Sequence, residues 1–203
     1  MQIKNIIFDF GGVLMDWDPR YFFKTYFNDD EKMEWFLKNI AIDEWNIEQD
    51  RGRTLKEGTE ILIEKHPDWE KEIRAYYDNW PVMLKSDIPK NVEILRKLEG
   101  KFHLYGLTNW SAETFPIALD NYDFFQLFED KIVVSGTEKL IKPGREIFEL
   151  LLKRYDLKAE ESVFIDDNIK NIETAKTLGF QVVHIKPETD LGDELKNLGI
   201  NFN

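Results

Sequence analysis

Residues 6–14 read Ile-Ile-Phe-Asp-Phe-Gly-Gly-Val-Leu, a short apolar run that carries a single carboxylate. The first three residues are typical of a buried strand, and Asp9 follows where the strand meets a glycine turn. A turn without bulky side chains leaves the backbone amides around Gly11 and Gly12 accessible to an anionic ligand. The stretch therefore predicts a strand that presents a candidate nucleophile, and it offers no second acid at Gly11.

The rest of the chain alternates β-rich runs with helical patterns, which is typical of an α/β fold with a parallel sheet and helices on both faces. Strands are expected over residues 3–8, 102–107, 131–134, 162–165 and 181–185, and helices over 90–99, 143–155 and 168–178. Polar residues follow the first four strands, namely Asp9, Thr108-Asn109, Ser135 and Asp166-Asp167. Because ligands of open parallel sheets bind at the carboxyl ends of the strands, these residues are expected to form one site.

Residues 16–84 contain no convincing strand and show apolar residues at helical spacing instead. Asp18-Pro19 has the pattern of a helix start, and Thr54 to Glu57 fits a capping box. This pattern predicts an all-α unit, a small helical bundle, inserted between the first and second strands. Five of the six tryptophans lie in it: Trp17, Trp35, Trp45, Trp69 and Trp80. They supply the core of the bundle, or one or two of them face a substrate.

Composition excludes several classes of function. The chain of 203 residues has no cysteine, so disulfides, zinc–thiolate sites and cysteine nucleophiles are ruled out. The net charge of −12 argues against nucleic acid or an anionic membrane surface as a partner. No run approaches the ~20 apolar residues of a membrane helix. The N-terminal apolar run is too short for a signal peptide, so a cytoplasmic location is expected.

Four motifs in this order resemble those of the haloacid dehalogenase-like hydrolase superfamily. They are residues 9–14, Leu107-Thr108-Asn109, Lys142-Pro143 and residues 163–168. The resemblance covers essentially the whole chain. It implies a Rossmann-like core of residues 1–15 and 85–203, and a C1-type cap of residues 16–84. Within the superfamily the chain is similar to the branch that includes α-D-glucose-1-phosphate phosphatase. The implied activity is Mg²⁺-dependent hydrolysis of a small phosphorylated metabolite, a sugar phosphate.

The resemblance assigns a role to each motif, and elementary chemistry agrees with it. Asp9 would be the nucleophile, because a carboxylate can accept a phosphoryl group as an acyl phosphate. Thr108 and Asn109 would donate hydrogen bonds to the phosphate, and Lys142 would supply a positive charge to it. Mg²⁺ prefers hard oxygen ligands. Those implied here are the carboxylates of Asp9, Asp166 and Asp167 and the carbonyl oxygen of Gly11.

One position departs from the family pattern. Most phosphatases of this superfamily carry an acid–base Asp two residues after the nucleophile, where this chain has Gly11. A substitute acid such as Asp16 or Asp18 would compensate, and so would a substrate with a good leaving group, such as an anomeric phosphate. Both are favoured because the other motif positions are filled.

Two other functions use the same scaffold. The first is a 2-haloacid dehalogenase-like hydrolase, which needs no metal. The paired acids Asp166 and Asp167 favour a metal-dependent enzyme over it. A non-catalytic protein that binds a phosphorylated ligand has Gly11 as its only support.

Overall fold

Five parallel strands form the central sheet of the computed structural model, which describes residues 2–202. They are β1 (Asn5–Phe8), β4 (His103–Thr108), β5 (Ile132–Val134), β6 (Ser162–Asp166) and β7 (Gln181–His184). Their order is β5-β4-β1-β6-β7, so β1 lies in the middle of the sheet. The expected parallel α/β architecture is confirmed. β1 is flanked by β4 and β6, and the residues that follow these three strands are therefore neighbours in space.

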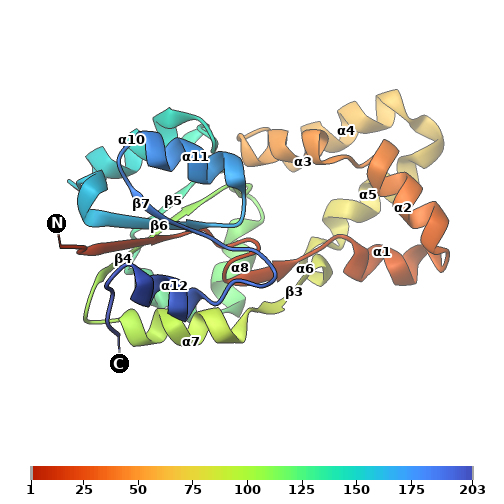
Figure 1. Ribbon diagram of the computed structural model, residues 1–203. Coiled ribbons are helices and arrows are strands. Elements are labelled where there is room, and N and C mark those ends of the chain that lie inside the picture. The colour runs from red at the N-terminus through yellow and green to blue at the C-terminus, as the bar shows by residue number, and fades with distance from the viewer. Residues whose placement is uncertain (1, 203) are drawn as a thin grey trace.

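Helices cover both faces of the sheet (Figure 1). One face carries α10 (Arg145–Arg154) and α11 (Ile169–Thr177), and the other carries α7 (Pro89–Leu98), α8 (Phe115–Asn121) and α12 (Leu191–Asn197). Side chains of β1 alternate between the two cores, with Ile7 on the α10 face and Ile6 and Phe8 opposite. The connections contain α9 (Ser135–Glu138) and the 3₁₀ turns η2 (Asp123–Phe128) and η3 (Ala159–Glu161).

Helix ends follow the expected signals with two exceptions. One is the start expected at Asp18-Pro19, because that helix begins at Arg20 with Pro19 at its N-cap position. Asn168 caps α11 by accepting a hydrogen bond from the Lys170 amide at 3.0 Å. The helix expected from Pro143 begins at Arg145 instead. Pro143 lies within a turn, closed by a hydrogen bond from the Gly144 amide to the Ile141 carbonyl at 2.9 Å. This turn leads the chain from the Lys142 position into α10.

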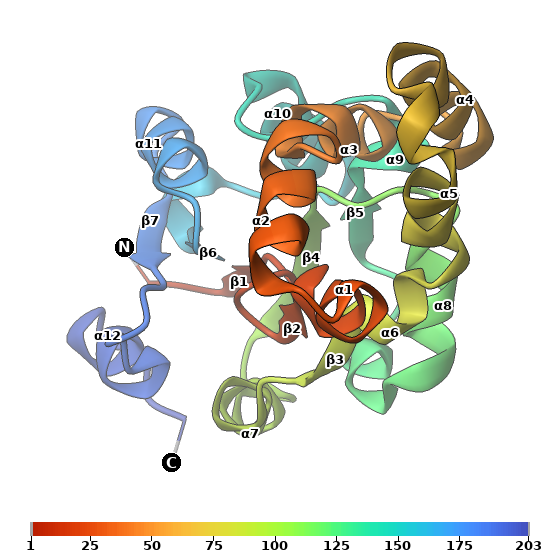
Figure 2. The same cartoon turned by 90° about the vertical axis from the view of Figure 1, so that its right-hand side faces the viewer.

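A helical insert, defined as residues 16–84, projects beyond the carboxyl ends of the strands (Figures 1 and 2). It has its own apolar core, in which Phe23, Phe36 and Tyr76 are buried. Its helices are α1 (Arg20–Phe27), α2 (Asp30–Asn39), α3 (Asp43–Asp50), α4 (Leu55–Lys65), the 3₁₀ turn η1 (Pro67–Trp69), α5 (Glu70–Asp78) and α6 (Trp80–Met83). Thr54 caps α4 through the Glu57 amide at 3.1 Å, as its sequence predicts.

The expectation that residues 16–84 contain no strand is wrong at both ends of the insert. β2 (Met15–Trp17) pairs antiparallel with β3 (Leu84–Asp87) where the chain enters and leaves the insert. Each strand has three or four residues and is buried on no consistent face, so it carries no alternating pattern. The pairing brings the two linkers together and ties the insert to the sheet.

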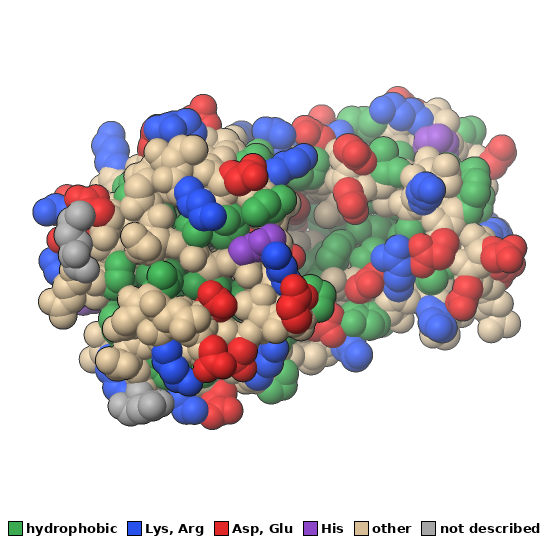
Figure 3. Space-filling view, in the orientation of Figure 1, with side chains coloured by type: hydrophobic (Ala, Val, Ile, Leu, Met, Phe, Trp, Pro, Cys, Tyr) green, Lys and Arg blue, Asp and Glu red, His purple; other side chains and the backbone are tan. Residues whose placement is uncertain are grey.

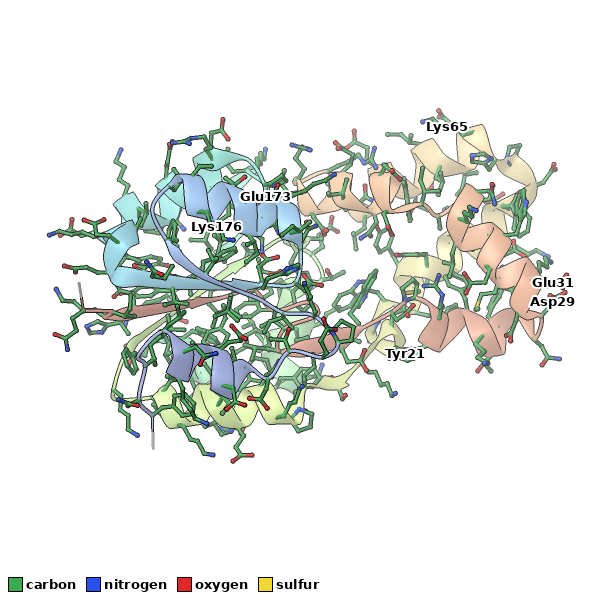
Figure 4. All side chains as sticks on the ribbon, viewed as in Figure 1. Tyr21, Asp29, Glu31, Lys65, Glu173 and Lys176 are labelled. Carbon is green, nitrogen blue, oxygen red and sulfur yellow. The ribbon has the colours of Figure 1, made fainter. Side chains whose placement is uncertain are left out.

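On the face shown in Figure 3, acidic and basic side chains are scattered over both parts of the molecule. Figure 4 shows Tyr21 near the base of the insert, with Asp29 and Glu31 at its far end. Glu173 and Lys176 lie on the α11 layer of the core (Figure 4). Within residues 2–202, no helix combines the length and the apolar character needed to cross a membrane.

Candidate functional site

Three carboxylates meet at the carboxyl ends of β1 and β6. Asp9 follows β1, Asp166 ends β6, and Asp167 comes next. One oxygen from each lies within 4.8 Å of the others. The register explains this convergence, because Phe8 pairs with Ile165 and the Asp9 amide donates to the Ile165 carbonyl at 2.9 Å. The structure therefore brings together the three acids that the sequence singled out.

Lys142 reaches this cluster from the loop before α10. Its side chain is fully buried, and Nζ lies 3.0 Å from Oδ1 of Asp9 and 2.7 Å from Oδ2 of Asp166. Nζ also donates to the Leu107 carbonyl at 2.9 Å, so all three ammonium protons have acceptors. Lys142 thus links β4, β1 and β6 at the site.

The three carboxylates differ in how many partners they have. Asp166 accepts hydrogen bonds from Lys142, from the Asn168 amide at 2.7 Å and from Asn171 Nδ2 at 3.0 Å. Asp9 uses Oδ1 for both Lys142 and the Phe10 amide, the latter at 2.8 Å, which leaves Oδ2 for a ligand. Asp166 is thereby suited to position Lys142, whereas Asp9 and the exposed Asp167 are suited to contact a ligand directly.

Burial and mutual repulsion make it unfavourable to ionise the Asp9 and Asp167 carboxyl groups in the absence of a cation. Burial raises the pKa of Asp9 to about 7; Lys142 opposes this rise, while Asp166 and Asp167 add to it. Burial and the charge of Asp166 also raise the pKa of Asp167. Burial would lower the pKa of Lys142, but Asp166 and Asp9 outweigh that effect and raise it. Lys142 is therefore a cation among three acids.

This donor set fits a hard divalent cation. When all groups are ionised, three carboxylates and one ammonium leave a net charge of −2, which one Mg²⁺ would balance. The glycine turn provides the space. Gly12 has a φ of +68°, and a Cβ there would overlap Oδ2 of Asp167. Nothing lies within 4 Å of a Cβ built on Gly11. The turn thus packs against Asp167 at Gly12 and stays open at Gly11.

Thr108 and Asn109, at the carboxyl end of β4, stand in different surroundings. Thr108 is the last residue of β4 and is buried. Asn109 pairs with the backbone of Lys142, because Nδ2 donates to its carbonyl at 3.0 Å and Oδ1 accepts from its amide at 2.9 Å. In this arrangement the Asn109 side chain holds the lysine loop in place.

A cavity of about 160 Å³ lies between the insert and the core, beside Gly11. The surface is hollowed between these two parts, and hydrophobic side chains line the hollow (Figure 3). Aromatic and polar residues share the cavity wall, namely Trp17, Tyr77, Trp80, Trp110, Asn46, Asp50, Asn109, Ser111 and Thr114. A larger cavity of about 530 Å³ surrounds Lys4, Gly100 and His103 at the opposite end of the strands. It contains none of the motif residues. A third cavity, of about 450 Å³, is lined by Gly12, Asp167 and His184 on the other side of the glycine turn. The smaller cavity is the one that joins Gly11 and Asn109 of the core to the insert, and it is taken as the candidate ligand pocket.

Of the five tryptophans of the insert, Trp17 and Trp80 line this pocket. The charged insert residues Arg20 and Arg51 form ion pairs instead, with Glu34 at 2.6 Å and with Glu48 at 3.3 Å. Trp45 packs inside the insert. The pocket residues missed from sequence are of two kinds. Trp110 and Ser111 directly follow the Thr108-Asn109 motif, and their position next to it could have suggested them. Asn46, Asp50 and Tyr77 come from helices of the insert whose sequences carry no motif.

Comparisons with known proteins agree with this geometry. A family model described as haloacid dehalogenase-like hydrolase matches residues 3–179. A sesquiterpene phosphatase of Aspergillus oryzae is 28% identical, with 96% of each chain covered. D-ribitol-5-phosphate phosphatase of Bacteroides thetaiotaomicron is 25% identical over 96% of this chain and 97% of its own.

A solved structure extends the comparison to the site. It is a haloacid dehalogenase family enzyme of Bacteroides thetaiotaomicron in complex with magnesium and inorganic phosphate. It is 26% identical, with 95% of this chain and 98% of that chain covered, and has a TM-score of 0.71. The family model spans most of the sheet and all four motifs, and the chain therefore belongs to the haloacid dehalogenase-like hydrolases.

Proposed function

We propose that this hydrolase is a Mg²⁺-dependent phosphatase that removes phosphate from a small sugar phosphate through an aspartyl-phosphate on Asp9. The observation that carries the proposal is the meeting of Asp9, Lys142, Asp166 and Asp167 beside a ligand-sized cavity. Named phosphatases among the relatives support it. In this proposal residues 1–15 and 85–203 form the catalytic core, and the insert acts as a cap that sets substrate choice.

The chain's own residues account for most of the chemistry. Lys142 and the Phe10 amide hold Oδ1 of Asp9, so Oδ2 attacks the phosphorus while the bond to the leaving oxygen breaks. Water then hydrolyses the aspartyl-phosphate and frees Asp9. Lys142 and Thr108 stabilise charge on the phosphoryl oxygens. Asp9, Asp167 and the Gly11 carbonyl would hold Mg²⁺, with Asp166 beside them, and the bound ion supplies positive charge that offsets repulsion between carboxylate and phosphate.

The cavity favours a small polar leaving group. A cavity of about 150 Å³ holds a molecule the size of benzene. A three-carbon sugar or polyol, which has as many heavy atoms as benzene, fits the 160 Å³ here, stacking on Trp17 or Trp80 and bonding to Asn46. A second candidate, an apolar organic phosphate, is favoured by the four aromatic side chains of the wall. Size does not separate the two classes, because a hexose and a fifteen-carbon group each have at least twice as many heavy atoms as benzene, so the substrate panel decides between them.

A substrate panel with and without Mg²⁺ tests the proposal. The panel contains sugar and polyol phosphates, farnesyl phosphate, p-nitrophenyl phosphate and 2-chloropropionate. We expect phosphate release in Mg²⁺ from sugar or polyol phosphates, and its loss in EDTA, because the acidic cluster then lacks its counter-charge. Chloride release in EDTA would establish a dehalogenase instead. Tight phosphate binding without turnover on any substrate would establish a binding protein.

The glycine turn offers a matched pair of variants. Gly12→Ala is expected to weaken Mg²⁺ activation by about 10–100-fold, because its Cβ displaces Asp167 and its φ of +68° disfavours alanine. Gly11→Ala adds the same methyl group to open space and keeps the carbonyl. The measurement is the Mg²⁺ concentration that gives half-maximal phosphate release. If the two variants needed the same Mg²⁺ concentration, Asp167 would not be a ligand of the metal.

A further inference from the structure

The proposed reaction needs a proton for the leaving oxygen, and Gly11 has no group to give one. The two substitute acids predicted from sequence, Asp16 and Asp18, form hydrogen bonds within the insert instead. Asp16 accepts a hydrogen bond from the Tyr21 hydroxyl at 2.8 Å, and Asp18 accepts from the Arg20 amide at 2.8 Å. Neither contributes to the wall of the 160 Å³ cavity among the described residues. An acid that protonates the leaving group therefore has to be sought among the other residues of the cavity wall.

Asp50 is the carboxylic acid in that wall, and it shares the cavity with Gly11 and Asn109. It is the last residue of α3, and its carbonyl accepts a hydrogen bond from the Ser135 hydroxyl at 2.5 Å. The same hydroxyl oxygen accepts from the Trp110 amide at 2.9 Å. One side chain of the core thus fixes the end of α3 against the loop that follows β4.

Two glycines make this docking close. A Cβ on Gly52 would lie 3.0 Å from the Gly136 carbonyl, and a Cβ on Gly136 would clash with the Ala112 amide. A second tether joins the Leu55 amide to the Glu113 carboxylate at 2.8 Å. The insert is therefore held against the core on both sides of the α3–α4 turn, which keeps Asp50 in place.

The Asp50 carboxyl stands in surroundings suited to proton transfer. The Ser111 amide donates a hydrogen bond to it, and burial raises its pKa to about 7 despite that bond. The hydroxyls of Tyr76 and Tyr77, from α5, are close enough to feel its charge, and Arg53 and Glu113 act on the Tyr77 hydroxyl in turn. The Lys139 side chain lies against Gly52, two residues further along the chain. Arg53 is engaged with Gln49 and the Trp45 carbonyl. Among residues 2–202, no cation forms an ion pair with Asp50 that would hold it in the charged form.

We propose that Asp50 protonates the leaving oxygen and then activates water, in place of the acid that Gly11 lacks; this inference rests on the proposed function. As the Asp9–phosphorus bond forms and the substrate P–O bond breaks, the proton of Asp50 passes to the departing oxygen. The products are an alcohol, the aspartyl-phosphate and an Asp50 carboxylate. That carboxylate takes a proton from water as the water oxygen attacks phosphorus, which releases inorganic phosphate, frees Asp9 and restores the acid.

Asp50→Asn tests the first half of the cycle through its dependence on the leaving group. For an alkyl phosphate such as glycerol 2-phosphate, kcat/KM is expected to fall by about 10²–10⁴-fold, the usual contribution of general acid catalysis. For p-nitrophenyl phosphate, whose leaving group departs without a proton, we expect a fall below about 10-fold. Equal losses on both substrates, or none on either, would overturn the proposal. Asp43→Asn, an exposed change on the same helix, is the control.

The pH profile and the second half of the cycle add independent readouts. The protonated acid is the active form in the first step, so wild-type kcat/KM for the alkyl phosphate declines as the pH rises through about 7. Asp50→Asn is expected to lack this limb. With p-nitrophenyl phosphate the variant should show a burst of nitrophenol equal to the enzyme concentration, because the aspartyl-phosphate persists. An alkyl-phosphate limb that persists in the variant would overturn the proposal.

A titration needs neither Mg²⁺ nor turnover. In metal-free protein, the carboxyl ¹³C resonance that is lost in Asp50→Asn is expected to titrate near pH 7; titration below pH 5 would overturn the proposal. The proposed function and the role of Asp50 are overturned by different results. A wild-type protein that releases no phosphate from any substrate removes the proposed function. An active wild type whose Asp50→Asn variant keeps full activity on alkyl phosphates removes only the role of Asp50.

Discussion

Asp9→Asn is expected to abolish phosphate release, with kcat lowered on the order of 10⁴-fold or more on every substrate. A carboxamide cannot form the acyl phosphate, so the reaction loses its covalent route. The free oxygen of Asp9 is the one aimed at the ligand, because Lys142 and the Phe10 amide both occupy Oδ1. The loss should therefore appear in kcat for good and poor leaving groups alike, unlike the loss expected from Asp50→Asn.

Folding does not account for that loss. Burial raises the pKa of Asp9 to about 7 in the metal-free protein, well above its ordinary value of 3.8. Such a group binds more protons folded than unfolded, so its contribution to stability is lost as the pH rises from about 4 through 7. At pH 8 the neutral asparagine removes an unfavourable buried charge, and the melting temperature should not fall. Asp16→Asn is the matched control and should keep its activity. An Asp9→Asn variant that retained a tenth of the wild-type turnover would contradict covalent catalysis.

The sheet and the acidic cluster were predictable because their signals are local. Apolar runs with polar ends mark strands, and parallel strands bring those ends to one edge of the sheet. Asp9 and Asp166 then meet because β1 and β6 are neighbours, which the family resemblance implies and the register shows. Lys142 carries no local signal of its own, and its position was available only from the order of the motifs.

The remaining features depend on contacts between distant segments. Pairing of β2 with β3 joins residues about seventy positions apart through strands too short to show alternation. Asp50 reaches the pocket only because Ser135, in α9, anchors the end of α3. The Asn109 side chain holds the Lys142 backbone through two hydrogen bonds, a contact between residues 33 positions apart. In each case the partner, which the sequence does not mark, determines what the residue does.

Lys142→Met is expected to have the largest effect on stability. The substitution keeps the length of the side chain but removes the cation that lies 3.0 Å from Asp9 and 2.7 Å from Asp166. Removing one partner of a buried ion pair costs about 3–5 kcal/mol, because an uncompensated charge is left behind. In a protein of this size, each kcal/mol lowers the melting temperature by about 2–4 °C. Activity should fall by about 10²–10³-fold as the phosphoryl oxygens lose a charge.

The pH dependence separates this electrostatic loss from a loss of packing. Lys142 opposes the rise in the pKa of Asp9, so without it the buried Asp9 carboxyl resists ionisation more strongly when folded, and the deficit in melting temperature should widen as the pH rises from 5 to 8. Added Mg²⁺ binds only the folded cluster and should recover part of the deficit at pH 8. Lys153→Met, an exposed change on α10, should alter neither quantity. A deficit that is the same at pH 5 and pH 8 and insensitive to Mg²⁺ would mean that Lys142 acts by filling space, because only a lost charge responds to both.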